Sequence, residues 1–264
     1  MKTFSWHRVV GVILRHLYNF KHNYDRLTDT FYWPFLDVLA FGFLAVAIDR
    51  MGTIPHTYRS ALLNCVILWF VLWRAQNEIS VGFLEELWSD NVGNTFGSPV
   101  SLFEYMLGIF ILDAVKIGLM FVFTSVTAFL VYGVNILTIG IVLIPLIVLL
   151  FLFGVSMGMM FMALFLRFGS TVQTLAWAGG TLILPFSGVY YPVSVFPDSW
   201  QWFIHLIPSS YLFESVRAVI TTGIVPWSNL LIAAGIISVY FIAASLFLKS
   251  SFQKAQQNGL SGLK

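Results

Sequence analysis

The stretch Ile136–Leu166, ILTIGIVLIPLIVLLFLFGVSMGMMFMALFL, runs for about thirty residues without one charged side chain. A bilayer core about 30 Å thick is crossed by roughly 20 apolar residues of α-helix, so this run is long enough to span it. The extra length predicts a helix that tilts or projects beyond the lipid. The chain is therefore expected to be an integral membrane protein.

The composition of the whole chain agrees with this expectation. Of its 264 residues, 58% are hydrophobic and only 10% are charged, whereas roughly 25% are charged in soluble domains. Five further apolar runs are candidate spans, at Trp33–Ile48, Arg59–Trp73, Ser101–Val131, Val172–Tyr190 and Asn229–Leu248. The run Arg59–Trp73 is short for a span unless residues 75–79 extend it. We expect one all-α membrane domain, in which residues 29–249 form a six-helix bundle and residues 250–264 form a flexible cytoplasmic tail.

Residues 1–28 precede the first predicted span, and residues 4–24 have helical periodicity. Apolar residues from Trp6 to Tyr24 fall on one side of this helix, and Arg8, Arg15, Asn19 and His22 fall on the other. Such a pattern is typical of a helix that lies in the membrane interface with its basic face toward anionic headgroups. An amphipathic helix docked on protein is the alternative, and we favour the interfacial helix.

The distribution of basic residues predicts the orientation. If the N-terminus is cytoplasmic, ten Lys and Arg residues lie on the cytoplasmic side, three lie outside and Lys116 lies within a span. Because cytoplasmic loops carry the excess of Lys and Arg, we expect both termini in the cytoplasm. The expected location of this multi-pass protein is the plasma or inner membrane of the cell. The chain contains no phosphate-binding loop and no Cys or His pairs at metal-ligand spacing, so it is not expected to hydrolyse ATP by itself.

The segment Gln76–Pro99 separates the second and third predicted spans on the cytoplasmic side. It carries four acidic residues and no basic one, next to an apolar stripe at helical spacing (acidic: Glu78, Glu85, Glu86, Asp90; apolar: Phe83, Leu84, Leu87, Trp88). A short amphipathic helix of this kind either docks a soluble partner or packs on the membrane ends of its own chain. The spacing alone does not decide between the two.

Asp37, Asp113 and Lys116 lie well inside predicted spans, away from their ends. Asp113 and Lys116 stand three residues apart on one helix face, and a lone charge at mid-bilayer costs roughly 2.5–3.5 kcal/mol, so we expect the two to pair with each other. A structural pair is the favoured interpretation, and a polar contact along a substrate path is the other. The same alternatives apply to Asp37 in the first span.

Small residues recur at helical spacing in the fourth and fifth predicted spans, as Gly154-Val-Ser-Met-Gly158 and as Ala176 with Gly180. Small residues four positions apart allow two helix backbones to approach closely in lipid. We expect packing within one chain rather than dimerisation.

The region after the fifth predicted span is rich in proline. Pro192 and Pro197 are expected to end that span, and Pro208 to begin a helix that carries Glu214 and Arg217 as an i, i+3 pair. Irregular backbone at membrane depth is tolerated only where protein or water covers it. We therefore predict a helical hairpin that re-enters the outer leaflet without crossing it.

Three local patterns in this order resemble the permease subunits of type-2 ATP-binding-cassette exporters. They are the Ser-Pro-x-Ser-x-x-Glu entry at residues 98–104, the Ser-Gly-x-x-x-Pro-x-x-x-x-Pro exit at residues 187–197, and Pro-x-x-Tyr-x-x-Glu-x-x-Arg at residues 208–217. The resemblance covers nearly the whole chain, because six spans and an amphipathic first helix accompany these patterns.

The resemblance implies partners and roles for the candidate residues. Two permease chains, expected as a homodimer, would work with separately encoded nucleotide-binding ATPase subunits that bind ATP and Mg, so no cofactor is expected on this chain. The segment between the second and third spans would be the coupling helix, with Glu85, Glu86, Trp88 and Asp90 at the ATPase. The hairpin would form the outer gate, through Pro185, Gly188, Pro192, Pro197, Pro208, Glu214 and Arg217.

The cargo expected from the residues is hydrophobic or amphipathic, drug-like or lipid-like, because the spans carry many aromatic side chains and few charges. Polysaccharide or glycolipid export is the runner-up, and an ATP-independent carrier or a membrane scaffold is the alternative from another class. Membrane lipids, but no nucleic acid, are expected among the partners.

Overall fold

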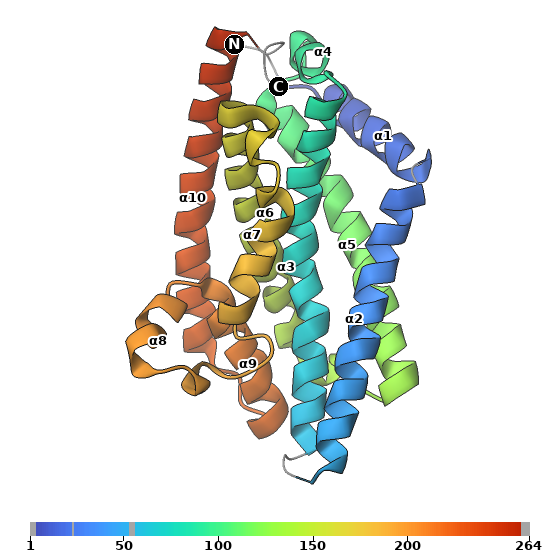
Figure 1. Ribbon diagram of the computed structural model, residues 1–264, viewed down its shortest axis with the longest axis vertical. Helices are drawn as coiled ribbons and strands as arrows, with labels where there is room; N and C mark the ends of the chain where they lie inside the picture. The colour runs from blue at the N-terminus through green and yellow to red at the C-terminus, as the bar shows by residue number, and fades with distance from the viewer. Residues whose placement is uncertain (1–3, 23, 53–55, 260–264) are drawn as a thin grey trace.

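A computed structural model describes residues 4–22, 24–52 and 56–259 of the chain, and these ranges form helices and no strand. The longer helices run along the long axis of a bundle together with the short helix α7 (Figure 1): α2 (Tyr24–Arg50), α3 (His56–Trp88), α5 (Leu102–Tyr132), α6 (Leu143–Phe168), α7 (Leu175–Ile183) and α10 (Trp227–Asn258). The prediction of an all-α protein is confirmed.

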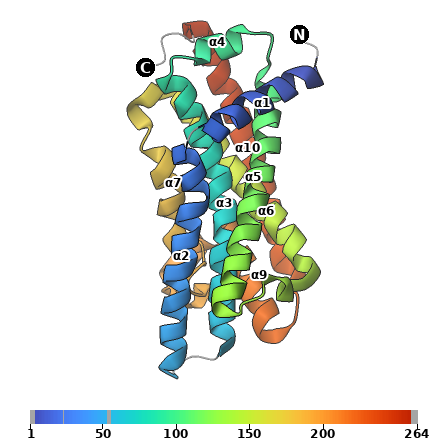
Figure 2. The same ribbon diagram turned by 90° about the vertical axis from the view of Figure 1, so that its right-hand side faces the viewer.

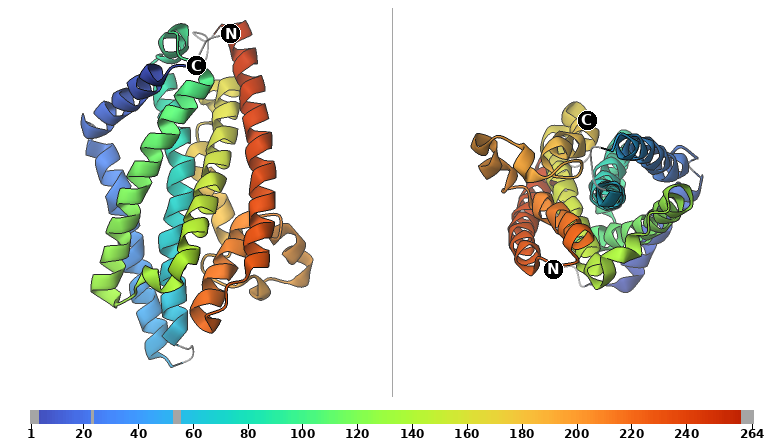
Figure 3. Two further views of the ribbon diagram at one scale, coloured as in Figure 1. Left: turned by 180° about the vertical axis from the view of Figure 1, so that it is seen from behind. Right: turned by 90° about the horizontal axis from the view of Figure 1, so that it is seen from below.

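Shorter helices lie at the two ends of this bundle. α1 (Trp6–His22), α4 (Val92–Gly97) and the last turns of α10 occupy one end, which we call the α4 end (Figures 1 and 2). α8 (Asp198–Ile204) and α9 (Pro208–Thr222) lie toward the opposite end, and α8 projects from the side of the bundle (Figure 3). Short 3-10 segments at 136–142, 169–172, 184–186 and 193–195 connect the helices.

Four helices in the described part of the chain are long and apolar enough to cross a membrane. They are Arg26–Arg50, Leu102–Tyr132, Ile136–Val172 and Trp227–Gln257. α3 has 33 residues but is not apolar enough to be among them, and α7 has only 9 residues. The protein is therefore a multi-pass membrane protein with four spans evident from length and composition.

α3 departs most from the prediction, because it continues from His56 to Trp88 instead of ending near Trp73. The segment predicted as a loop with its own short helix is the last part of this one helix. Gly82 is the only Gly or Pro between residues 74 and 88, and Arg74 pairs with Glu78 one turn later. The side chains are polar, but nothing in the backbone ends the helix.

α6 packs on α3 through the predicted small residues. A Cβ atom on Gly154 would lie 2.3 Å from the Leu72 carbonyl oxygen, and one on Gly158 would lie 2.8 Å from Ile79 Cβ. Gly180 of α7 similarly makes room for Trp73 of α3, whose Cδ1 atom would lie 2.7 Å from an added Cβ. Both small-residue spacings therefore serve packing within the chain, as expected.

The fifth predicted span and the predicted tail also differ from the structure. α7 ends at Ile183 and the chain continues in a 3-10 turn at residues 184–186, where Pro185 removes a backbone donor. α10 instead continues to Asn258, because Phe252 and Ala255 are buried and the Phe252 ring meets Phe96 at 4.7 Å. Residues 260–264 of the predicted tail lie outside the described residues.

Candidate functional site

The basic face of α1 packs on protein, which corrects the prediction that it faces lipid headgroups. Arg15 Nη2 lies 2.6 Å from Glu86 Oε2, and Arg15 Nη1 donates to the Thr95 hydroxyl at 2.7 Å. Arg8 pairs with Glu104 at 3.3 Å. These arginines face acids on α3 and α5, while apolar α1 side chains such as Leu14 and Tyr18 are left uncovered.

The first bundle helix, α2, begins at Tyr24, which lies before the predicted start of the bundle at residue 29.

Glu104 also explains where α5 begins. Its carboxylate accepts from the backbone N–H of Ser101 at 2.8 Å, and the Ser101 hydroxyl accepts from the Glu104 N–H at 3.2 Å. This reciprocal capping box satisfies two donors at the helix start. The Ser5 N–H donates to the same carboxylate at 2.8 Å, so one side chain joins the start of α1 to the start of α5.

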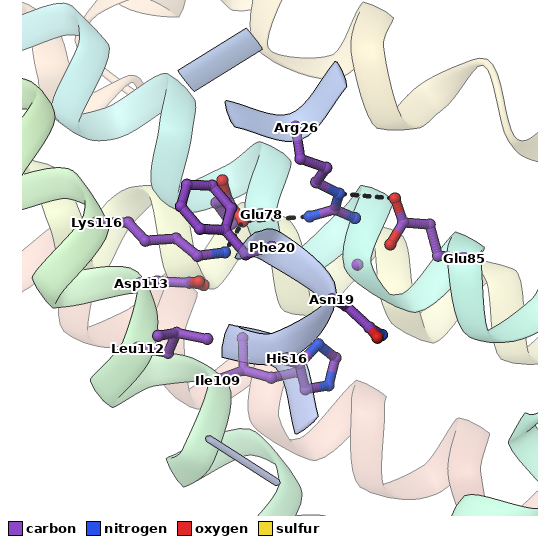
Figure 4. Close-up of a pocket in the computed structure, with 11 residues that line it drawn as sticks. His16, Asn19, Phe20, Arg26, Glu78, Glu85, Ile109, Leu112, Asp113 and Lys116 are labelled. Atoms are coloured by element: carbon purple, nitrogen blue, oxygen red, sulfur yellow. Dashed lines mark hydrogen bonds and ion pairs between the residues drawn. The ribbon is translucent and has the colours of Figure 1, made fainter. Parts of the chain in front are cut away.

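Glu78 lies at the centre of a buried group of charges near the α4 end (Figure 4). Its carboxylate lies 2.8 Å from Lys116 and 3.3 Å from Arg26, as Figure 4 shows. It also lies 2.6 Å from Arg74. Only 3% of the Glu78 side chain is exposed, and the three cations come from α3, α5 and α2. We call these four residues the Glu78 cluster. A buried carboxylate is stable when cations and hydrogen bonds surround it, as they do here.

Arg74 and Arg26 each have a second acidic partner. Arg74 Nη1 lies 2.6 Å from Asp29, and Arg26 Nε lies 2.7 Å from Glu85. Glu85 therefore pairs with α2, and Glu86 pairs with α1. Two of the residues predicted to face an ATPase thus have partners within the chain.

The predicted pairing of Asp113 with Lys116 is wrong. Lys116 reaches across to Glu78 on α3, and its ammonium group also lies over the Phe20 ring at 4.5 Å. Asp113 is buried, and its Oδ2 atom has no hydrogen-bond partner among the described residues. The spacing along one helix correctly put the two charges on one face, but it carried no information about a carboxylate on another helix.

His16 borders the Glu78 cluster from α1 (Figure 4). Burial, with the positive charges of Arg15, Lys116 and Arg26, lowers the pKa of His16 from 6.5 to about 4. The imidazole is therefore neutral at neutral pH. Its Nε2 atom lies 3.9 Å from Glu86.

The turn after α3 contains the remaining candidate coupling residues. Trp88 is 51% exposed, donates from Nε1 to Gln173 at 3.1 Å and stacks on Trp177 at 6.1 Å. Asp90 is exposed and has a left-handed backbone with φ of 50°. Of the four candidates, Trp88 and Asp90 are the ones that lie on the surface of this end.

The proline-rich region is organised by one arginine. Arg217 of α9 donates to the carbonyl oxygens of Gly188 and Val189 and pairs with Glu214 at 3.2 Å, which confirms the predicted i, i+3 pair. Glu214 in turn accepts from the Val193 N–H at 2.8 Å. Gly188 has φ of 79°, a conformation that favours glycine.

The prolines set the limits of the elements around this arginine. Pro185 lies in the 3-10 turn after α7, Pro192 and Pro197 flank a second 3-10 turn, and Pro208 is the first residue of α9. Through Arg217 and Glu214, α9 contacts the backbone of residues 188, 189 and 193.

Asp37 lies near the middle of α2 and faces a cavity of about 180 Å³ between α2, α3 and the segment after α7. Aromatic side chains make up most of the lining, among them Trp33, Trp69, Trp73 and Tyr190. We call this cavity the Asp37 pocket. Asp37 was a candidate from the sequence, but the aromatic residues around it were not. The signal was present, because Trp33, Asp37 and Phe41 stand at i, i+4 and i+8 on one helix face.

No group of three or more His, Cys, Asp or Glu residues that could hold a metal ion occurs among the described residues.

Comparison with protein families matches residues 53–246 to the ABC-2 family transporter proteins, and this range is well over half of the chain. The comparison with curated proteins finds no match.

Proposed function

Since this chain belongs to the ABC-2 transporter family as a membrane-spanning permease subunit, we propose that it forms half of an ATP-driven exporter. The family match over residues 53–246 carries this proposal, because permeases of this family normally work with a separate ATPase. ATP and Mg would be bound by that partner. The cargo would be hydrophobic or amphipathic and would move outward.

We propose six spans, which adds α3 and α7 to the four apolar helices. α3 is 33 residues long, and its charged last part pairs with α1, α2 and α5, so few of these charges face lipid. α7 with its 3-10 extension forms an apolar helix from Leu175 to Phe186. α8 and α9 would be the two arms of a re-entrant hairpin that acts as the outer gate, held by Arg217.

The α4 end would face the cytoplasm. The excess of basic residues predicted for that side supports this orientation, because α1, the end of α6 and the end of α10 all lie there (Figure 1). Both termini would then be cytoplasmic. The uncovered apolar side chains of α1 would contact lipid, although its basic face does not.

The turn Trp88–Asp90 with α4 would be the surface that docks the ATPase. Trp88, Ser89, Asp90 and Asn94 are exposed there, whereas Glu86 is buried against Arg15. A conformational change at this turn would reach α5 through the Glu78 cluster, because α3 is continuous from one to the other. Glu85 and Glu86 would position α3 rather than bind the partner directly.

Co-expression with an ATPase subunit tests the proposal. The permease should co-purify with it, and inverted vesicles should accumulate an amphipathic substrate only when ATP and Mg are supplied. Asp90→Lys combined with Trp88→Ala should abolish co-purification while the permease still elutes as a folded particle. Asp198→Lys, at an equally exposed aspartate in α8, is the matched control. Normal co-purification of the double variant would show that the partner docks elsewhere.

A further inference from the structure

The Asp37 pocket is built from two helix faces and a fixed connecting segment. Trp33, Asp37 and Phe41 point from successive turns of α2, and Trp69 and Trp73 from successive turns of α3. The third wall is Tyr190, whose ring stacks on Phe41 at 4.6 Å. Its backbone carbonyl accepts from the Tyr58 hydroxyl at 2.9 Å, so the wall is attached to α3.

The pocket contains one charge, and no described residue that lines it carries the opposite charge. Within the part of the chain that the structure describes, no Lys, Arg or His lines the cavity, and the Asp37 carboxylate makes no ion pair or hydrogen bond. The nearest arginine along α3, Arg74, is bound to Asp29 and Glu78. An unpaired carboxylate inside a membrane helix is costly and typically marks a substrate or ion path.

The aromatic side chains that line the pocket favour a positively charged ligand with apolar groups. The faces of Trp and Tyr rings carry negative potential and attract cations, most strongly where water is excluded. Trp69 is 5% exposed and Phe70 is 3% exposed, so the inner wall is buried, whereas Trp33 at the rim is 52% exposed. A carboxylate among aromatic faces repels anions and offers a hydrated metal ion only one charged ligand.

We propose that the Asp37 pocket binds a hydrophobic organic cation, such as an ammonium ion that carries apolar substituents. The carboxylate of Asp37 balances the charge, and the rings of Trp33, Trp69 and Trp73 contact the substituents. The volume of about 180 Å³ suits a ligand of modest size. That this cation is a transported substrate rests on the export function proposed above, whereas its binding to the pocket does not.

Binding to the permease alone, reconstituted in lipid nanodiscs, tests the site. Tritiated phenyltrimethylammonium in equilibrium dialysis should bind the wild-type chain above the background of empty nanodiscs. Neither benzenesulfonate, an anion of similar size, nor tert-butylbenzene, the neutral isostere, should displace it. Equal displacement by either competitor, or no binding to the wild-type chain, would overturn the proposal.

Variants separate the contributions of charge and ring. Asp37→Asn should weaken binding about tenfold or more, and Asp37→Glu should retain most of it, because a desolvated charge pair depends on the carboxylate. Trp69→Leu should weaken binding by several-fold. Asp198→Asn and Trp227→Leu, at exposed positions in α8 and α10, are the matched controls. Unchanged affinity in Asp37→Asn, with a normal elution profile, contradicts the site.

The two proposals fail in different ways. If phenyltrimethylammonium binds but no ATPase subunit associates and no ATP-driven uptake occurs, the site stands and the export function falls. If ATP-driven uptake occurs but the cation neither binds nor competes with the cargo, the export function stands and the substrate class falls.

Discussion

Glu78 and Asp37 are both carboxylates within membrane helices, but the chain treats them in opposite ways. Glu78 meets three cations within 3.3 Å, contributed by three different helices. Asp37 meets aromatic rings. The first carboxylate is satisfied by the fold, so its role is to hold helices together. The second has no cation beside it among the described residues, which agrees with the proposed binding site.

The largest loss of stability is expected from a substitution of Glu78. Glu78→Gln removes the carboxylate partner of Lys116 and one of the two acidic partners of Arg74 and of Arg26. Removing one partner of a buried ion pair costs about 3–5 kcal/mol. The free energy of unfolding, measured by denaturant titration in mixed micelles, should fall by about that amount. A loss below about 1 kcal/mol would mean that the cluster does not stabilise the fold.

A second test uses pH. Between pH 6.5 and 4 the unfolded chain binds a proton at His16 that the folded chain does not, because the folded pKa is about 4. Stability should therefore be constant above about pH 7 and decrease as the pH falls, by roughly 3 kcal/mol at pH 4 from this residue. His16→Gln should flatten the dependence in this window, and His22→Gln, at an exposed position, should not. Equal slopes in all three proteins would contradict the assignment.

A smaller effect is expected at the edge of the cluster. Arg15→Gln removes the partner of Glu86, but the Arg15 side chain is 35% exposed, so we expect a cost of about 1 kcal/mol. Amide hydrogen exchange in α1 should become faster, because its attachment to α3 is lost. Lys21→Gln, on the same helix, is the control. Unchanged exchange in Arg15→Gln would show that other contacts hold α1.

The smallest effect on stability is expected at Asp37. Asp37→Asn removes a charge that has no partner among the residues that the structure describes, so stability should remain unchanged or rise by up to about 1 kcal/mol. The same denaturant titration measures it. A loss comparable to that of Glu78→Gln would mean that Asp37 is a structural residue, and the contrast between the two carboxylates would disappear.

Local patterns predicted the elements that depend on neighbours in sequence. The charge-free run at 136–166, Pro208 at the start of α9, and the i, i+3 pair of Glu214 and Arg217 all act over one or two helical turns. The expectation that Pro192 and Pro197 end the fifth span was wrong, because α7 already ends at Ile183. The extension of α3 to Trp88 was missed because polar residues were taken as the end of a span. The same residues are helical because α1 and α2 cover them with arginines.

Partners across helices could not be predicted from spacing. Lys116 was expected to pair with Asp113, three residues away, but it pairs with Glu78, which lies 38 residues earlier in the chain. The basic face of α1 was expected to meet lipid, but acids of α3 and α5 cover it. In each case a charge has many possible partners at similar cost, and only the packing of whole helices selects one.

The sequence by itself determined that this protein resides in a membrane, that it is helical and that it resembles the permeases to whose family it belongs, because these properties follow from composition, periodicity and short motifs. The tertiary structure alone decided which charges are satisfied. It placed three cations around Glu78 and none at Asp37, since burial and pairing depend on which helix faces meet.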